Sequence, residues 1–145
     1  MRVFVFALIL MSVSLKAMSA EVRPGVMRTP DTMFENLKDF DFEPNYMNIK
    51  GLRIHYLDEG PEDGQPIFLL HGQPTWGYLF RHMITPLADA GYRVIVPDMA
   101  GFGRSDKPTK KEAYSYPKHI EIMSELVERL ELNDAVFFGQ GWGGL

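Results

Sequence analysis

The chain has 145 residues, of which 46% are hydrophobic and 23% are charged, a composition typical of a globular protein with one core. Its 15 basic and 19 acidic residues give a net charge of −4, which argues against a nucleic acid or an anionic membrane as a partner. Because cysteine is absent, the chain can form neither a disulfide nor a cysteine metal site, and packing alone must hold it together.

The first twenty residues have the pattern of a secretory signal peptide. A basic Arg2 precedes an apolar run over residues 3–15, and Lys16 and a cluster of small residues follow it. A membrane anchor is the alternative, but the run is shorter than the ~20 residues that a bilayer span needs. We therefore expect cleavage near Ala20 and a periplasmic or secreted protein. Cleavage would leave 13 basic residues against 19 acidic ones.

The next segments divide into a lead-in and one folded domain. Residues 21–45 are rich in Pro, Asp and Asn and show weak periodicity, so we expect a lead-in that is ordered by contact with a domain over residues 46–145. That domain begins with alternating residues on either side of Lys50-Gly51, which is typical of a β-hairpin.

Strands and helices then alternate along the chain. Short apolar runs at residues 66–70 and 93–96 indicate strands buried on both faces. Between them, apolar residues recur at helical spacing from Trp76 to Leu87, and Gly91 is placed to end that helix. A second helix is expected from about Tyr116 to Leu130, and a third buried strand over 135–138. This order predicts an α/β fold in which a hairpin leads into a mostly parallel sheet with helices on both faces.

Ligands of such sheets bind beyond the carboxyl ends of the strands, where three segments of this chain lie. These segments are residues 71–76, 98–106 and 139–144. At the first, backbone N–H groups of a strand-to-helix junction can stabilise a developing negative charge, although a plain helix start is the alternative. We expect His71 to lock this turn through hydrogen bonds. The polar side chains of the second segment are expected to fix their loop rather than to act in catalysis: Asp98, Arg104 and Asp106.

The third segment has the spacing of a nucleophile elbow, in which a nucleophile stands between two glycines directly after a buried strand. The central residue here is Gly141, which relieves backbone strain at positive φ but supplies no nucleophile. The glycines at 139, 141 and 144 also fit a dinucleotide-binding fingerprint. That motif, however, should follow the first strand of its unit and precede an acidic residue about 20 positions later.

Together these motifs resemble the haloalkane dehalogenases of the α/β-hydrolase superfamily. The resemblance rests on residues 71–81, on the loop 101–108 and on the elbow, and similar stretches extend it to nearly all of residues 28–145. The order of the motifs is typical of the dehalogenase and epoxide hydrolase branch, and Pro74-Thr75-Trp76 favours the dehalogenases. The chain would then be the N-terminal part of an α/β-hydrolase fold, truncated at the nucleophile elbow.

The resemblance also implies a chemistry and a set of site residues. In the family, an elbow aspartate attacks the carbon that bears the halogen, and water activated by a histidine with an acidic partner hydrolyses the resulting ester. Gln73 and Trp142 would supply backbone N–H groups to the oxyanion site, and the Trp142 indole would hold the halide. A buried packing role is the alternative for Trp142. The implied partner is a small halogenated organic substrate, with no organic cofactor and no metal; the oligomeric state stays open.

Two departures from the family lead us to expect no turnover from this chain. Gly141 stands where the family has aspartate, and the chain ends at Leu145, before the family's acid and histidine. None of its four histidines stands at the position of the catalytic one: His55, His71, His82 and His119. An interrupted reading frame would explain both departures. The alternatives are an epoxide hydrolase-like fragment and a non-catalytic binding protein on the same fold.

Overall fold

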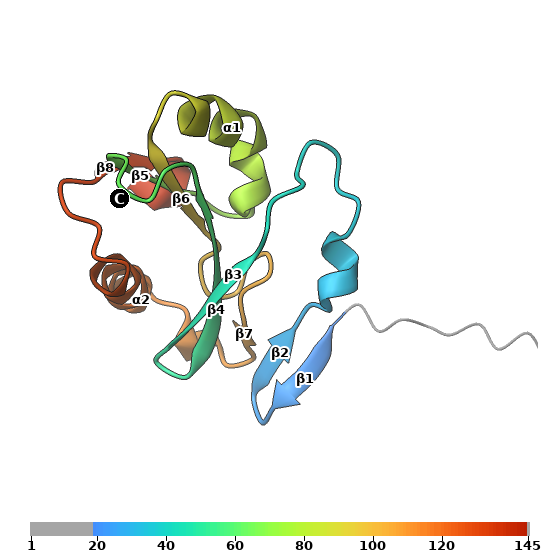
Figure 1. The fold of residues 1–145 in the computed structure, drawn as a ribbon. Coiled ribbons are helices and arrows are strands. Elements are labelled where there is room, and N and C mark those ends of the chain that lie inside the picture. Colours follow the sequence, from blue (N-terminus) through green and yellow to red (C-terminus); the bar gives the residue numbers. More distant parts are fainter. Residues whose placement is uncertain (1–18, 145) are drawn as a thin grey trace, which may run out of the picture.

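The computed structural model describes residues 19–144, which form a five-stranded sheet with helices on both faces and a small three-stranded sheet beside it (Figure 1). The predicted signal peptide lies outside the described residues except for Ser19 and Ala20. No helix within residues 19–144 is long and apolar enough to cross a bilayer. The two sheets together carry the three loops that the sequence singles out.

The five-stranded sheet has the order β3-β4-β6-β5-β8. Its strands β3 and β4 form the predicted antiparallel hairpin, β4 and β6 are also antiparallel, and β5 runs parallel to both β6 and β8. The hairpin therefore leads into three parallel strands, as the sequence predicts. The bounds are β3 (Asn45–Ile49), β4 (Leu52–Glu59), β5 (Pro66–Leu70), β6 (Arg93–Pro97) and β8 (Val136–Gly139).

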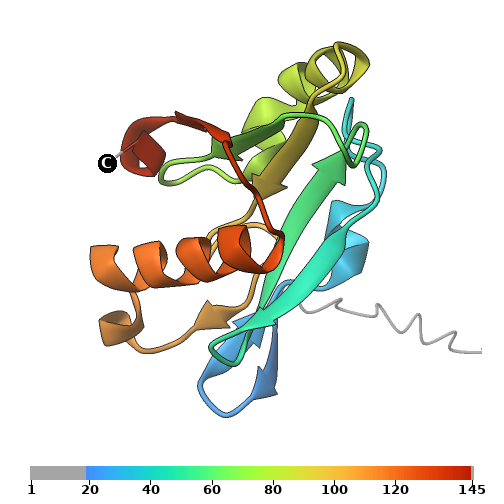
Figure 2. The ribbon, with the colours of Figure 1, turned by 60° about the vertical axis from the view of Figure 1, so that its left-hand side comes forward.

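Helices cover both faces of this sheet, with α1 (Arg81–Asp89) on one side and α2 (Tyr116–Arg129) on the other (Figure 2). Consecutive residues of a strand point to opposite faces, so the buried residues of β6 divide between two cores. Ile95 packs in the core beneath α2, whereas Val94 and Val96 pack in the core beneath α1. This division explains why the strand is a continuous apolar run.

Both predicted helices form, with small differences at their ends. The first begins as a 3-10 turn, η2 (Gly77–Phe80), before it continues as α1, and the second ends one residue earlier than predicted. Two more short 3-10 turns are η3 (Lys111–Ala113) and η4 (Gly141–Gly144), the latter directly after β8. The helices thus start and end near the positions that their apolar spacing indicates.

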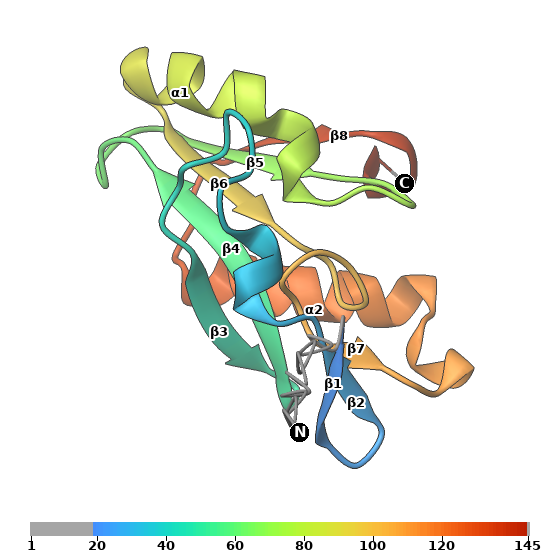
Figure 3. The same ribbon diagram turned by 90° about the vertical axis from the view of Figure 1, so that its right-hand side faces the viewer.

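The lead-in is more regular than its sequence indicates. It contains β1 (Ala20–Arg23), β2 (Val26–Arg28) and the 3-10 turn η1 (Asp31–Phe34). The two strands form a hairpin around Gly25, which has a φ of 77°, and β2 pairs with β7 (Lys107–Pro108) (Figure 3). Strands of three or four residues are too short to show a period of two, so the pattern gave no signal for this hairpin.

Strand β8 lies at the edge of the five-stranded sheet, with its side chains largely uncovered. The rings of Phe137 and Phe138 are 60% and 48% exposed, although each contacts one phenylalanine of the core, Phe68 and Phe80 respectively. A strand with apolar residues on both faces is usually found inside a sheet. The strand is therefore found where the sequence predicts it, but the prediction that it is buried is wrong for the described residues.

Candidate functional site

The site forms where the three parallel strands end. Strands β5, β6 and β8 are neighbours with parallel β5–β6 and β5–β8 pairing, so the loops that follow them emerge at the same edge of the sheet. The Gln140 N–H donates to the Leu70 carbonyl at 3.0 Å, which ties the elbow to the first loop. The Met99 N–H donates to His71 Nε2 at 3.0 Å, which ties the second loop to the first.

The elbow and the first loop approach each other so closely that three glycines leave no room for a side chain. A Cβ atom on Gly143 would overlap the Leu70 carbonyl, and one on Gly72 would overlap the Gln140 carbonyl. A Cβ atom on Gly139 would overlap the backbone of Gly143. These contacts explain why glycines stand on both sides of residue 141.

Replacing one of these glycines should strain the elbow. We expect Gly143→Ala to destabilise the chain by roughly 1–3 kcal/mol, because the added methyl group forces a backbone shift. Gly144→Ala is the matched control, since its Cβ atom would meet no heavy atom closer than 3.4 Å. Urea unfolding of the two variants measures the difference, and equal midpoints would contradict the close packing of this turn.

Gly141 differs from its neighbouring glycines because there is space around it. Its φ of 55° is the left-handed conformation of an elbow nucleophile, and the nearest heavy atom to an added Cβ would be the Gly72 Cα at 3.9 Å. The turn thus keeps the backbone and the room that a nucleophile requires, and it carries no side chain.

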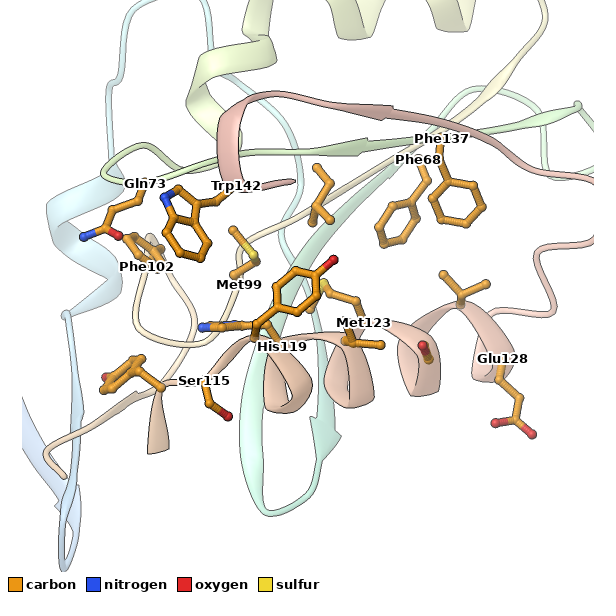
Figure 4. A pocket seen from close by; sticks show the side chains of 16 residues that line it. Phe68, Gln73, Met99, Phe102, Ser115, His119, Met123, Glu128, Phe137 and Trp142 are labelled. Carbon is orange, nitrogen blue, oxygen red and sulfur yellow. The ribbon is translucent and has the colours of Figure 1, made fainter. Parts of the chain in front are cut away.

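The two residues expected to form the oxyanion site, Gln73 and Trp142, line the same pocket beside the elbow. Within residues 19–144, no acceptor is found for the backbone N–H of Gln73 or of Trp142. Their side chains line the same end of one pocket (Figure 4). Trp142 is 60% exposed among the described residues. Donation to an oxyanion or a halide agrees with this arrangement and stays a prediction.

The pocket itself has a volume of about 730 Å³ and extends from the elbow between α2 and the sheet (Figure 4). Most of its lining is apolar, with Met99 and Phe102 near the elbow and Met123 and Phe137 farther along. A space of this size and character suits a small apolar organic molecule. The pocket could not be predicted from the sequence, because its lining residues extend from Phe68 to Trp142 and meet only in the fold.

The second loop is fixed by the buried carboxylate of Asp98. It accepts hydrogen bonds from His55 Nδ1, from the Gly77 N–H and from the Arg104 N–H, each at 2.8 Å. Burial would raise the pKa of Asp98, but the hydrogen bond and charge of His55 and these backbone donors together lower it. The predicted role of Asp98 in fixing this loop is confirmed. His55 was missed as its partner, since 43 residues separate them.

The other two polar residues of this loop also fix it in place. Arg28 Nε donates to Asp106 Oδ1 at 2.7 Å and Arg28 Nη2 donates to Oδ2 at 3.1 Å, which ties the N-terminal hairpin to the loop. The Arg104 guanidinium donates to the Phe34 carbonyl at 3.3 Å. The structural role predicted for Asp106 and Arg104 is therefore confirmed, and the contact with Arg28 explains how the lead-in is held.

His71 is fully buried and holds the first loop as a neutral ring. Its Nδ1–H donates to the Gly72 carbonyl at 3.0 Å, and its Nε2 accepts from Met99. Burial lowers the pKa of His71 below 6.5, against smaller opposing effects of the Gly72 carbonyl and Asp98. The predicted locking role is confirmed, and a protonated ring could no longer accept the Met99 hydrogen bond.

This burial makes the stability of the chain sensitive to acid. Because the folded-state pKa of His71 is lowered, the unfolded chain takes up the proton first as the pH falls below 6.5, and stability is lost from there down to the folded-state value. Burial lowers the pKa of His119 in the same direction. We expect His71→Gln to reduce the loss of unfolding free energy between about pH 7.5 and about pH 5.5. An unchanged pH slope in urea unfolding would contradict this assignment.

Within residues 19–144, no three His, Asp or Glu side chains are grouped so that they could hold a metal ion.

The alternative of a dinucleotide-binding site is not supported, because the glycine-rich segment follows β8, which comes after the parallel strands β5 and β6 in the chain. An acyl or alkyl transfer site that uses an elbow residue and backbone donors is the chemistry that fits this geometry.

Comparison with known proteins places this geometry in a family. Residues 65–145 match the family model described as the alpha/beta hydrolase fold. Haloalkane dehalogenases of Mycolicibacterium paratuberculosis and Psychrobacter cryohalolentis are 55% and 50% identical to this chain in alignments 125 residues long, and each alignment covers 83% of this chain. The same residues are 42% and 41% of those relatives.

Solved structures give the same result. The haloalkane dehalogenase DpaA of Paraglaciecola agarilytica, whose structure is described as tetrameric, is 44% identical, with a TM-score of 0.79 over 82% of this chain and 42% of its own. An epoxide hydrolase of Vigna radiata is 26% identical, with a TM-score of 0.66 over 71% of this chain and 33% of its own. The epoxide hydrolase alternative is thus the weaker one. The chain belongs to the α/β-hydrolase fold family, and it resembles haloalkane dehalogenases over about two-fifths of their length.

Proposed function

We propose that this chain carries the nucleophile-elbow part of a haloalkane dehalogenase-type site, and that Gly141 leaves this site without its attacking group. The observation that carries the proposal is the empty space at residue 141, where the backbone has a φ of 55° and Gly72 lies opposite. The identity of 50–55% to haloalkane dehalogenases supports the reaction class. A small halogenated organic compound is the corresponding substrate.

The reaction requires a carboxylate at position 141. An oxygen of that carboxylate would form a bond to the substrate carbon while the carbon–halogen bond breaks, and the halide would leave with the bonding electrons. The Trp142 indole N–H, exposed in the pocket, would donate to the departing halide. During ester hydrolysis, the backbone N–H groups of Gln73 and Trp142 would stabilise the oxyanion. With glycine at 141 the first bond cannot form.

The test joins residues 19–145 to the remaining part of the Mycolicibacterium paratuberculosis relative, with Gly or Asp at position 141. Halide release from 1,2-dibromoethane is then measured for both proteins. Release with Asp and none with Gly would support the proposal. Release at similar rates from both would show that residue 141 is not the nucleophile position.

We also propose that residues 1–20 direct export and are removed near Ala20, so that the mature protein is periplasmic or secreted. The basic, apolar and small-residue pattern of the sequence supports this proposal. Removal of Ala20 would leave the pairs Glu21 with Met27 and Arg23 with Val26 in the β1–β2 hairpin. N-terminal sequencing of the protein recovered from a Gram-negative host tests the site, and an uncleaved N-terminus would contradict it.

A further inference from the structure

A second hollow, separate from the elbow pocket, is lined by residues of the β1–β2 hairpin, the β3–β4 turn, the segment after β7 and the first half of α2. It has a volume of about 420 Å³ and shares no lining residue with the elbow pocket. We propose that this hollow binds an alkyl phosphate, that is, a phosphate group joined to an apolar chain.

The charge of the hollow carries the first part of this proposal. Four cationic side chains line it, Arg23, Lys50, Lys110 and Lys118, whereas Glu121 is the one carboxylate among its lining residues. The chain as a whole is acidic, with a net charge of −4, so the local sign is the reverse of the overall sign. Such a concentration of positive charge in a concave surface attracts anions, and a phosphate most strongly because it carries up to two charges.

Contacts with the backbone hold part of this rim in place. The Arg23 guanidinium donates to a carbonyl of the β3–β4 turn, and Lys118 Nζ donates to a carbonyl of η3 at 2.6 Å. Lys50 Nζ lies 3.7 Å from Glu121 and 3.9 Å from Glu125. The Lys50 and Glu121 side chains are half exposed, and exposed ion pairs of this length are weak. The Lys110 ammonium group has no hydrogen-bonded or ionic partner within the described residues. The rim can therefore offer cations to a phosphate without breaking a strong internal pair.

The apolar floor of the hollow carries the second part. Leu52, Pro108 and Ala113, which are partly exposed, form the accessible apolar surface of the hollow, together with the buried Val26 from β2 and Ile122 from α2. A bare phosphate would leave the floor in contact with water. An attached alkyl chain would cover it, and each buried methylene group adds to the affinity through the hydrophobic effect.

The experiment titrates the full chain with hexyl phosphate, inorganic phosphate and hexanol by isothermal calorimetry. We expect hexyl phosphate to bind, and inorganic phosphate to bind roughly tenfold more weakly, since two buried methylene groups supply that difference. Hexanol should show no binding because it lacks the charge. Affinity for hexyl phosphate should fall as the salt concentration rises.

Lysine substitutions locate the binding. Lys110→Gln and Lys118→Gln are each expected to weaken hexyl phosphate binding by about fivefold. Lys38→Gln is the matched control, because Lys38 is exposed and does not line the hollow, and its affinity should be unchanged. All three positions are on the surface, so thermal unfolding should show the same midpoint for each variant.

Vesicles of phosphatidylglycerol and of phosphatidylcholine distinguish a membrane headgroup from a free ligand. Binding to phosphatidylglycerol vesicles that is lost in the Lys110→Gln/Lys118→Gln double variant supports a lipid headgroup as the natural source. Binding of hexyl phosphate that depends on the two lysines, without binding to the vesicles, supports a free phosphate ester as the natural ligand. Absence of hexyl phosphate binding, equal affinity for inorganic phosphate, or binding that ignores both lysines would overturn the proposal.

Discussion

Gly141→Asp is expected to raise halide release by roughly ten-thousand-fold or more in the protein that joins residues 19–145 to the rest of a dehalogenase, because removal of a covalent nucleophile typically costs that much. The structure has room for the new side chain, since only the Gly72 Cα at 3.9 Å lies near its Cβ. Bromide release from 1,2-dibromoethane gives the rate.

The same substitution should lower stability, because a residue with a Cβ at a φ of 55° costs roughly 1–2 kcal/mol. Gly141→Ala is therefore the control: it introduces the same backbone strain without a carboxylate. We expect the Ala and Asp variants to unfold at similar urea concentrations and the Asp variant alone to release bromide. Activity in the Ala variant would place the attacking group elsewhere.

Local patterns carried most of what the sequence revealed about this fold. The strands β5 and β6 are buried on both faces, so each is a continuous apolar run that stands out in the sequence. The elbow could be found because its glycines are required by backbone contacts that no larger residue allows, as at Gly139 and Gly143. The strands can be recognised from residues that are close together in the sequence. The elbow can be recognised because only glycine fits where two backbone segments touch.

Features that depend on distant contacts could not be found in this way. The ion pair between Arg28 and Asp106 joins residues 78 positions apart, and the hairpin that it anchors has strands too short to show alternation. The basic hollow combines residues from four separate segments, each with one cation. In the sequence those cations are dispersed among more numerous acidic residues, and only the fold brings them together.

The buried carboxylate of Asp98 explains how the site keeps its shape without a ligand. It connects the strand β4 through His55, the start of η2 through Gly77 and the second loop through Arg104. The Ser105 hydroxyl adds a further tie by donating to the Asp98 carbonyl at 2.6 Å. The first loop, which contains Gln73, leads directly into Gly77, so the position of the Gln73 N–H group relative to the elbow depends on a residue outside the pocket.

Asp98→Ala is accordingly expected to destabilise the chain by about 3–5 kcal/mol, because His55 and two backbone N–H groups would lose a common acceptor in a fully buried place. Typical domains have only about 5–15 kcal/mol of total stability, so a large part of the chain should unfold at low urea concentration. Asp98→Asn retains the shape and one acceptor oxygen and should lose less.

Asp63→Ala is the matched control, since Asp63 is exposed and makes no side-chain hydrogen bond or ion pair within the described residues. Its effect on the free energy of unfolding should stay within about 0.5 kcal/mol.

Hydrogen exchange separates the effect of Asp98 on the neighbouring loop from its effect on the stability of the whole chain. In Asp98→Asn, the amide of Gly77 should exchange faster than amides of β5 and β6, because its acceptor is replaced while the core strands keep theirs. Uniform acceleration of all amides would mean that Asp98 supports the core in general and not the loop that carries Gln73.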